Sequence, residues 1–318
     1  MGWWNDLEWD RSGVTVKKTG ARIEYSKDVL KDTVKWLPYG LIERLRAPFR
    51  VRDRIRVYAL PVIPRYWYLL RVSLSRLGVQ FVDSVTDSDV AIYFDDSTYS
   101  EAPHLLNGPA VQLNFECRDI SKTHVQTVFK DVFDYDLGVN PREYTGRMVA
   151  KSEINGTHTG KIVQGPCDIE DGYVYQKLID NRSDNQRVTD IRCPTLFGEI
   201  PLIYLKSRPE DQRFDNLNTH VVMSTANEQF TIEEIDKIRL FCDAMKLDWG
   251  GLDILRDAAD GRIYIVDVNK TDMGPPLSLS LKNKLKSTSI LAKALETAID
   301  NRLKAVPTSS QNQRDVTL

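Results

Sequence analysis

Apolar and polar positions follow a clear order from Ile55 onward, where short apolar runs are separated by a stretch of helical spacing. The pattern predicts strands over residues 55–62, 79–82, 89–96 and 110–115. A helix is predicted over 64–78, opened by Pro64 and closed by Gly78. Strands that alternate with a helix indicate an open α/β sheet of modest size, which we assign to a domain over residues 51–118.

Hairpin signals replace this alternation near residue 120. The predicted elements are a helix over 121–138, hairpins over 146–164 and 190–208, and a strand over 172–180. The first hairpin turns through a glycine-bearing loop, INGTHTG at 154–160, and Gly198 lies near the tip of the second. These signals predict two antiparallel-sheet subdomains with helices, over residues 119–180 and 181–304.

The helix with the strongest local signals lies in the C-terminal part. Thr231 can cap it, and Glu234 three residues later completes a capping box. Its predicted buried stripe consists of Ile235, Ile238, Phe241 and Met245. A hairpin over 251–269 and a helix over 288–305 follow.

The two ends of the chain lack such a pattern. Residues 1–50 are rich in tryptophan and charge without a clear period, and we treat them as an N-terminal extension. Residues 305–318 are mostly polar and are predicted to form a disordered tail.

The composition indicates a globular protein without a strong overall electrostatic field. Of the 318 residues, 42% are apolar, which is enough for two or three packed units. Lys and Arg total 43 against 45 Asp and Glu, so no net charge favours nucleic acid as a partner. The four cysteines contain no C-x-x-C pair, which argues against a disulfide framework or a zinc knuckle. We expect a cytoplasmic location, because no apolar run approaches bilayer length and the N-terminus lacks signal-peptide grading.

One predicted hairpin carries acids that face each other. If its strands pair around Asp260 and Gly261 without a bulge, Asp253 lies directly opposite Asp267. Opposed carboxylates destabilise a sheet unless a cation neutralises them. Asn269 points to the same face as Asp267, and three oxygen donors on one face suit Mg²⁺. An isolated D-x-N more often ends a strand at a turn, but the opposed acid favours a metal site.

The stretch GGLDILRDAADGRIYIVDVN at 250–269 resembles the metal-binding signature of ATP-grasp enzymes, above all that of ribosomal-protein glutamate ligases and glutathione synthetase-like ligases. The resemblance implies an α+β fold in which a nucleotide lies between two antiparallel sheets, after a small α/β domain. It assigns Asp253, Asp267 and Asn269 to Mg²⁺, with Mn²⁺ as a substitute. The family usually has Glu where this chain has Asp267.

The same resemblance implies which residues bind ATP. Lys151 would reach the α- and β-phosphates, and the loop with Gly156 and Gly160 would close over them. The adenine pocket would be lined by Gln176, Lys177 and Leu178. Without this context, a lysine at the end of a strand such as Lys151 is more often simply solvated.

Basic residues are expected around the γ-phosphate and the acceptor. The segments TDIR, LKSRP and RFDNLN, at 189–192, 205–209 and 213–218, resemble family segments with that role. These segments assign the role of binding the γ-phosphate and the acceptor to Arg192, Arg208 and Asn216. Arginine offers a planar fork for phosphate and carboxylate oxygens, although each arginine taken singly is as well explained by a surface ion pair.

The implied activity is an ATP-dependent carboxylate–amine ligase that acts through an acyl phosphate and releases ADP and phosphate. Its expected partners are small-molecule or peptide carboxylates and amines, and a homodimer is left open. Two segments depart from the family pattern: KTDMGPP at 270–276 and Asn218-Thr219-His220. Because they help shape the acceptor side, a kinase acting on a hydroxyl is the alternative, and a nucleotide-gated binding protein is a third.

The run RLRAPFRVRDRIR, from Arg44 to Arg56, is a separate feature. It suits a phosphorylated or lipid-headgroup ligand, or a membrane surface, with Trp36, Tyr66 and Trp67 near it in sequence. A charge run of this kind is more often a solvated face.

Overall fold

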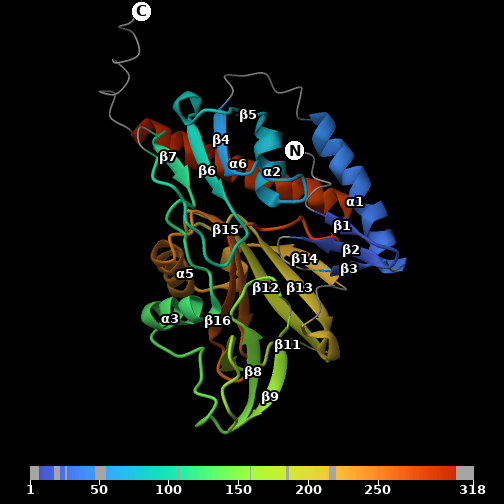
Figure 1. Cartoon of the computed structure of the whole chain (residues 1–318), viewed down its shortest axis with the longest axis vertical. Helices are drawn as coiled ribbons and strands as arrows, with labels where there is room; N and C mark the ends of the chain where they lie inside the picture. Colours follow the sequence, from blue (N-terminus) through green and yellow to red (C-terminus); the bar gives the residue numbers. More distant parts are fainter. Residues whose placement is uncertain are drawn as a thin grey trace, which may run out of the picture.

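The computed structural model describes residues 7–17, 22–25, 27–46, 55–105, 108–157, 159–183, 186–214 and 220–305. Within them, three sheets succeed one another along the longest axis of the molecule, and a fourth small sheet lies near the N-terminus (Figure 1). The predicted site residue Asn216, the tail after residue 305 and residues 47–54 of the arginine run lie outside the described residues.

The first domain contains a parallel sheet, as the alternation of strands and helix predicts. Its strands, in the spatial order β5-β4-β6-β7, are Gln80–Phe81, Arg56–Pro61, Val90–Phe94 and Val111–Leu113. Strand β6 is buried along its whole length, as a central parallel strand should be. Helix α2 (Leu69–Leu77) packs beside it and ends at Gly78, whose φ of 72° favours glycine.

Helix α2 begins at Leu69 rather than at the predicted Pro64. The residues before it form a turn that is fastened to the segment after the last strand of the chain. The Leu69 N–H donates to the Asp272 carbonyl, and the Gly274 N–H donates to the Trp67 carbonyl, both at 3.0 Å. These long-range hydrogen bonds satisfy backbone groups that a longer helix would have used locally.

Two antiparallel sheets make up the second half. Helix α3 (Lys122–Phe133) precedes the smaller one. The smaller sheet has the order β10-β8-β9, with strands Tyr173–Lys177, Gly146–Ser152 and Lys161–Gly165. The larger sheet has the order β14-β13-β12-β15-β16, with β11 beside β12. Its strands from β11 to β16 are Arg182–Ser183, Arg187–Leu196, Ile203–Pro209, His220–Ser224, Trp249–Arg256 and Ile263–Asn269.

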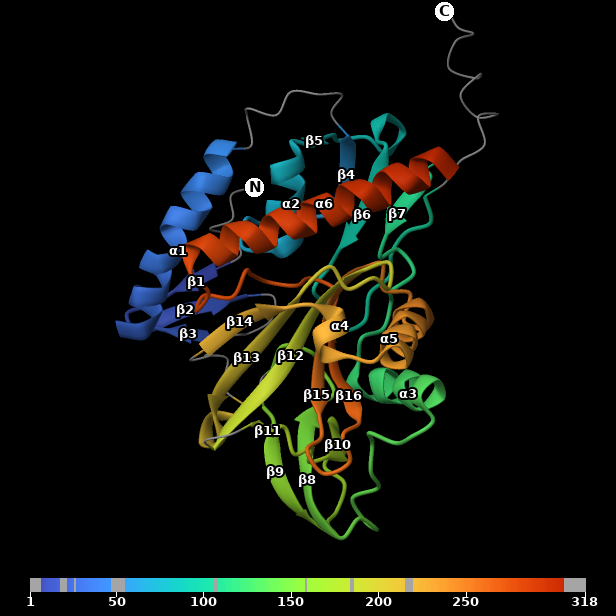
Figure 2. The ribbon, with the colours of Figure 1, turned by 180° about the vertical axis from the view of Figure 1, so that it is seen from behind.

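Helices α3 and α5 (Ile232–Ala244) cover one face of the larger sheet, and the short α4 (Ala226–Gln229) leads into α5 (Figure 2). The predicted capping box of α5 is confirmed, because Thr231 Oγ1 accepts from the Glu234 N–H and the Glu234 carboxylate accepts from the Thr231 N–H. In the predicted stripe, Ile238, Phe241 and Met245 are buried and Ile235 packs against them. The other face of the sheet is not covered by these helices, and it carries the candidate metal-site residues.

Asp253 and Asp267 are direct partners across β15 and β16, as predicted. Closer to the turn, however, Ile254 pairs with Ile265, so Val266 is an extra residue and the expectation of a regular hairpin is wrong there. The bulge has a physical reason. In a regular strand Ile265 and Asp267 would share a face, whereas the bulge sends Ile265 into the core and Asp267 to the opposite face.

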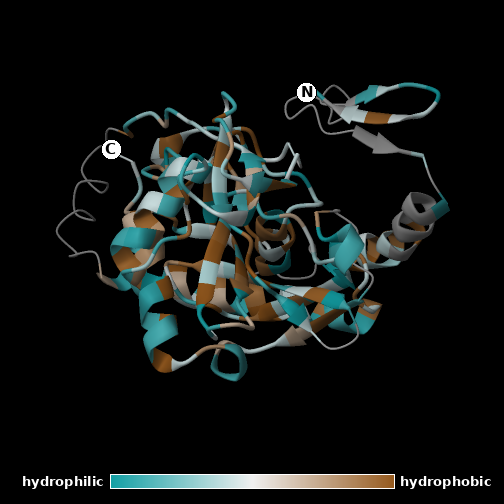
Figure 3. Cartoon of the chain, turned by 90° about the horizontal axis from the view of Figure 1, so that it is seen from below, coloured by the Kyte–Doolittle hydropathy of each residue, from teal (hydrophilic) through white to brown (hydrophobic). Residues whose placement is uncertain are grey.

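The N-terminal residues contain elements that the hydrophobic pattern does not reveal. Strands β1 to β3 form an antiparallel sheet over Leu7–Trp9, Gly13–Val16 and Arg22–Glu24. Seen from below, this sheet stands to one side of the main body (Figure 3). Helix α1 (Lys27–Arg46) packs on α2 and on α6 (Leu281–Ala305), which begins before the predicted residue 288. In the described part of the chain, no helix combines the length and the apolarity needed to cross a bilayer.

Candidate active site

The side chains predicted to bind metal lie on the face of the larger sheet opposite α3 and α5. Leu252 and Ile254 of β15 are buried in the core beneath the helices, so Asp253 between them points to the other face. Arg192 of β12 is the direct strand partner of Asp253 and shares that face. The loop between β8 and β9 reaches the same place through Asn155.

Each of the two opposed acids has a cation as its partner. Arg192 Nη1 lies 2.7 Å from Asp253 Oδ2, and Lys122 Nζ lies 2.6 Å from Asp267 Oδ1. Burial alone would raise the pKa of Asp253, but Arg192 and Lys206 outweigh it and lower that pKa to about 2. The repulsion expected between the two carboxylates is therefore offset by side chains of the protein itself.

Lys122 is a site residue that sequence reasoning missed. Its ammonium bridges Asp267 and Asn155, whose Oδ1 is 2.9 Å away, and its side chain is only 7% exposed. The available signal was its position as the first residue of α3, after the cap Ser121. A positive charge there opposes the helix dipole, so a lysine at this position calls for a nearby anion.

The smaller sheet presents Lys151 and Gln176 on one face. Lys151 pairs with Val174 and Gln176 pairs with Val149, and side chains of strand partners share a face. Gln176 is 1% exposed, and neither its amide oxygen nor its nitrogen has a hydrogen-bond partner among the described residues. A buried amide without partners is costly unless a ligand supplies them.

The other two predicted adenine-pocket residues are placed differently. Lys177 leaves β10 on the opposite face from Gln176, and its Nζ lies 5.9 Å from the centroid of the Tyr264 ring. Leu178 follows the strand and is half-buried. Only Gln176 therefore shares a face with Lys151.

The Lys151 ammonium lies in the charge field of the acid hairpin. Burial lowers the pKa of Lys151 to about 8; Asp267 opposes this shift and Lys122 adds to it. Near neutral pH, Lys151 is thus a cation held with Lys122 beside two carboxylates.

The loop predicted to close over phosphates is held at both ends. The Asn155 N–H donates to Thr98 Oγ1 of the first domain at 2.8 Å. Gly156 has a φ of +78°, which favours glycine, and a Cβ on Gly160 would lie 3.0 Å from the Phe214 ring. The loop therefore joins the first domain, the smaller sheet and the segment that begins the RFDNLN stretch.

The segment after β16, which departs from the family pattern, is also anchored. Arg192 Nη2 and Nε donate to Asp272 Oδ1 at 2.6 and 3.2 Å, and Asp272 is 3% exposed. Lys270 is 1% exposed and its Nζ donates to Ser100 Oγ at 2.7 Å. Arg192 is thus shared between Asp253 and Asp272, so its charge is already compensated from two sides.

Arg208 belongs to a second cluster on the same sheet. It donates to Asp190 through Nη2 and to the Arg213 carbonyl through Nε at 2.9 Å. Asn181 donates to Asp190 at 2.9 Å and accepts from Arg213 at 2.7 Å. The positive charge of Arg208 still contributes to the low pKa of Asp253. The structure therefore brings Arg192 and Arg208 toward the acid hairpin.

The sequence matches no protein-family model and no curated protein. Among solved structures, the ATP-grasp ligase PsnB complexed with minimal precursor superimposes with a TM-score of 0.50 at 13% identity, covering 77% of this chain and 99% of that one. The chain has the ATP-grasp fold. D-alanine–D-alanine ligase from Bacillus anthracis gives 0.47 at 14% identity, with 79% and 98% covered. A RimK domain protein from Sphaerobacter thermophilus gives 0.44 at 12%, with 74% and 96% covered.

The predicted fold class is confirmed, and the donor set of the hairpin with Asp253 and Asp267 fits a hard divalent cation. In the described residues, no three His, Cys, Asp or Glu side chains form a cluster that could hold a metal. The hairpin instead offers two carboxylates and the amide oxygen of Asn269. Mg²⁺ binds through one or two carboxylates and takes its other ligands from water and phosphates, so this set is sufficient.

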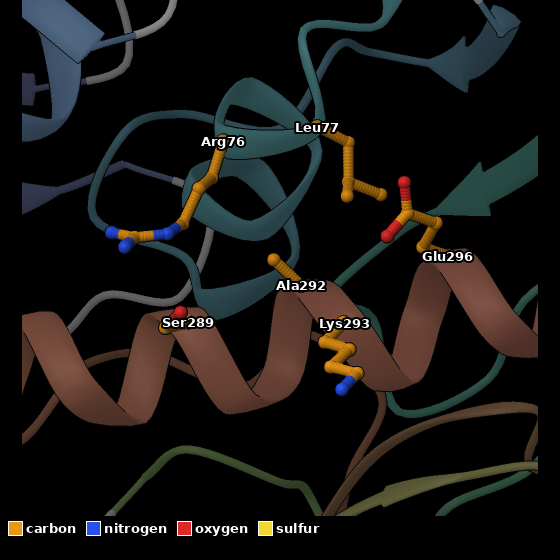
Figure 4. Close-up of a pocket in the computed structure, with 6 residues that line it drawn as sticks. All are labelled: Arg76, Leu77, Ser289, Ala292, Lys293 and Glu296. Atoms are coloured by element: carbon orange, nitrogen blue, oxygen red, sulfur yellow. The ribbon is translucent and has the colours of Figure 1, made fainter.

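A hollow of about 210 Å³ lies elsewhere, between α2 and α6 (Figure 4). It is lined by Arg76, Leu77, Ser289, Ala292, Lys293 and Glu296. None of these side chains belongs to the candidate site around Asp253 and Asp267, so the hollow is not part of it.

Removing Arg192 should destabilise the protein strongly. Arg192→Met leaves the carboxylates of Asp272 and Asp253 without their cation, and a buried charge left unpaired costs about 3–5 kcal/mol. The double variant Arg192→Met/Asp272→Leu should recover a large part of that loss. Urea unfolding measures both, and Arg239→Met, which breaks only exposed ion pairs, should cost less than about 1 kcal/mol. Equal stability of Arg192→Met and the wild type would contradict the assignment.

Proposed function

We propose that the protein is an ATP-dependent carboxylate–amine ligase that forms an amide through an acyl phosphate and releases ADP and phosphate. The observation that carries the proposal is the position of Lys122. Its ammonium joins the acid hairpin, through Asp267, to the glycine-bearing loop, through Asn155. A cation that lies between two acids able to bind a metal and a glycine-bearing loop able to approach phosphates is well placed to bind a polyphosphate.

The smaller sheet supplies the nucleotide side of the proposed site. The buried Gln176 amide lacks partners among the described residues and would find them on an adenine base. Lys151, on the same face, would contact the α- and β-phosphates, and Gly156 and Gly160 allow the loop to approach them. Lys177 and Leu178 follow at the end of the strand, and the Leu178 backbone would complete the pocket.

Asp253, Asp267 and Asn269 would hold Mg²⁺, or Mn²⁺ in its place. The ion would supply positive charge that offsets the negative charge of the phosphates during transfer. When the acids bind metal, Lys122 and Arg192 are no longer needed to offset their repulsion. Lys122 and the Nη1 group of Arg192 are then available to phosphate oxygens, while Nε and Nη2 of Arg192 keep Asp272.

The proposed reaction needs no side-chain nucleophile. A substrate carboxylate oxygen bonds to the γ-phosphorus as the bond to the β-phosphate oxygen breaks, and ADP leaves. An amine nitrogen then attacks the acyl carbon, phosphate leaves, and the nitrogen loses a proton. Lys122, Lys151, Arg192 and Arg208 position the charged groups, and such preorganised charge is usually the largest catalytic contribution. Asn216, outside the described residues, stays a predicted acceptor-side residue.

A kinase that phosphorylates a hydroxyl is the second candidate. The segment at 270–276 supports this alternative, because it departs from the ligase pattern on the acceptor side. Lys270 and Asp272 are both buried and turned toward protein partners, so they leave Met273, 63% exposed, as the prominent side chain beside them. The two candidates share the nucleotide site and differ in the acceptor. The ligase requires a carboxylate and an amine together, whereas the kinase requires one alcohol.

ADP release during a screen of amino acids, short peptides, other carboxylates and alcohols tests the proposal. Peptides belong in the screen because the ATP-grasp ligase PsnB is complexed with a precursor. Asp267→Ala and Lys122→Met should each lower the rate by about a hundredfold or more. The matched controls are Asp236→Ala and Lys130→Met, which change exposed ion pairs and should keep wild-type rates. ADP formed without any amine would favour the kinase, and absence of ATP binding would overturn both candidates.

ATP binding should weaken as the pH rises above about 8. In the free protein Lys151 loses its proton near that pH because burial lowers its pKa. Binding a polyphosphate requires the ammonium, so the dissociation constant should rise by up to about tenfold per pH unit. Titration calorimetry between pH 7 and 10 measures this, and Lys151→Arg, which keeps its charge, should flatten the profile. A profile unchanged by that substitution would remove Lys151 from the site.

A further inference from the structure

Helix α1 is apolar on the side that faces away from the protein. Val34, Leu37, Leu41 and Leu45, which we name the α1 stripe, are 57%, 57%, 59% and 57% exposed. Their spacing of three or four residues places them in one row along the helix. A helix on a protein surface normally turns such a row inward, so its outward position calls for an occupant.

The opposite face of α1 is fixed to the body. Tyr39 is fully buried, and its hydroxyl lies 2.8 Å from Thr288 Oγ1 of α6. Glu43 is 2% exposed and accepts from Arg76 of α2 at 2.5 Å. Arg76 also lines the hollow between α2 and α6 (Figure 4). These contacts hold the turns that contain Tyr39 and Glu43, so the α1 stripe cannot rotate into the core.

Basic residues lie at the C-terminal end of the α1 stripe. Arg44 and Arg46 lie in the last turn of α1 and are exposed. The sequence then continues with Arg50, Arg52 and Arg54, and with Arg56, which lies in β4 and is paired with Asp89 at 2.7 Å. The two acids of this stretch are Glu43, which is buried and paired, and Asp53. The exposed charge at this end of the helix is therefore basic.

We propose that α1 docks on an anionic lipid surface, with the stripe at the boundary of headgroups and acyl chains and with Arg44 and Arg46 on the headgroups. An apolar row flanked by basic residues is the pattern of a helix that lies in the membrane interface. Each arginine near an anionic surface strengthens binding a few-fold. The helix lies on the membrane, since none of the described helices is suited to cross it.

A second copy of the chain fits the stripe less well. Four side chains of this exposure offer roughly 400 Å², about half of the 800 Å² that each partner of a stable dimer buries. Pro38 also lies within the helix and on its exposed side, and it interrupts the regular ridge that helix pairing needs. Pairing two such helices would in addition bring basic ends together.

Flotation of the full chain with vesicles tests the proposal. We expect binding to vesicles of phosphatidylcholine mixed with phosphatidylglycerol, weaker binding to phosphatidylcholine alone, and release as salt is raised. Leu37→Glu/Leu41→Glu should lower the bound-to-free ratio by about tenfold or more. The matched control is Leu240→Glu on α5, also 57% exposed, which should bind like the wild type.

A second variant provides the test if the first one is destabilised. If Leu37→Glu/Leu41→Glu does not unfold with the same urea midpoint as the wild type, Arg44→Gln/Arg46→Gln replaces it and should weaken binding to anionic vesicles about tenfold. The proposal is overturned if the wild type does not float with anionic vesicles, or if the stripe variant and Leu240→Glu bind equally. A wild-type dimer that the stripe variant converts to a monomer, without vesicle binding, would assign the stripe to a second copy instead.

Discussion

The repulsion between two carboxylates on neighbouring strands is the constraint on which the rest of the site depends. Asp253 and Asp267 are direct partners in a hairpin, where like charges cost stability unless cations offset them. The protein places Arg192 of β12 and Lys122 of α3 against them. Both cations are nearly buried, so these pairs fix the positions of a strand and a helix as well as neutralising charge.

The same two cations also connect the acid pair to other parts of the protein. Lys122 also holds Asn155, whose backbone is bonded to Thr98 of the first domain. Arg192 also holds Asp272, whose carbonyl accepts from the first N–H of α2. The acid pair is therefore linked by direct contacts to the glycine-bearing loop and to the parallel sheet. Under the proposed function, a ligand that binds the acids would act on all of these parts together.

The sequence predicted those features that depend on local spacing. The capping box at Thr231, the left-handed end of α2 at Gly78 and the opposition of Asp253 and Asp267 all follow from residues close in the chain. The bulge at Val266 could not be predicted in this way. It turns Ile265 toward the core and Asp267 toward the site, and these two directions are decided only when the sheet packs. Lys122 was missed because its partner Asp267 is 145 residues away. Helix α1 was missed although its apolar row has helical spacing, because Pro38 and Gly40 lie within it and are typical of a turn rather than a helix interior.

A crystal structure of the chain with a non-hydrolysable ATP analogue and Mn²⁺ would show directly whether the acid hairpin holds a metal beside a nucleotide. We expect an anomalous peak for Mn²⁺ within bonding distance of Asp253, Asp267 and Asn269, the polyphosphate beside Lys151, and Lys122 withdrawn from Asp267 toward a phosphate oxygen. A nucleotide bound elsewhere, or a bound nucleotide with the Lys122–Asp267 and Arg192–Asp253 pairs intact and no metal between the strands, would contradict it.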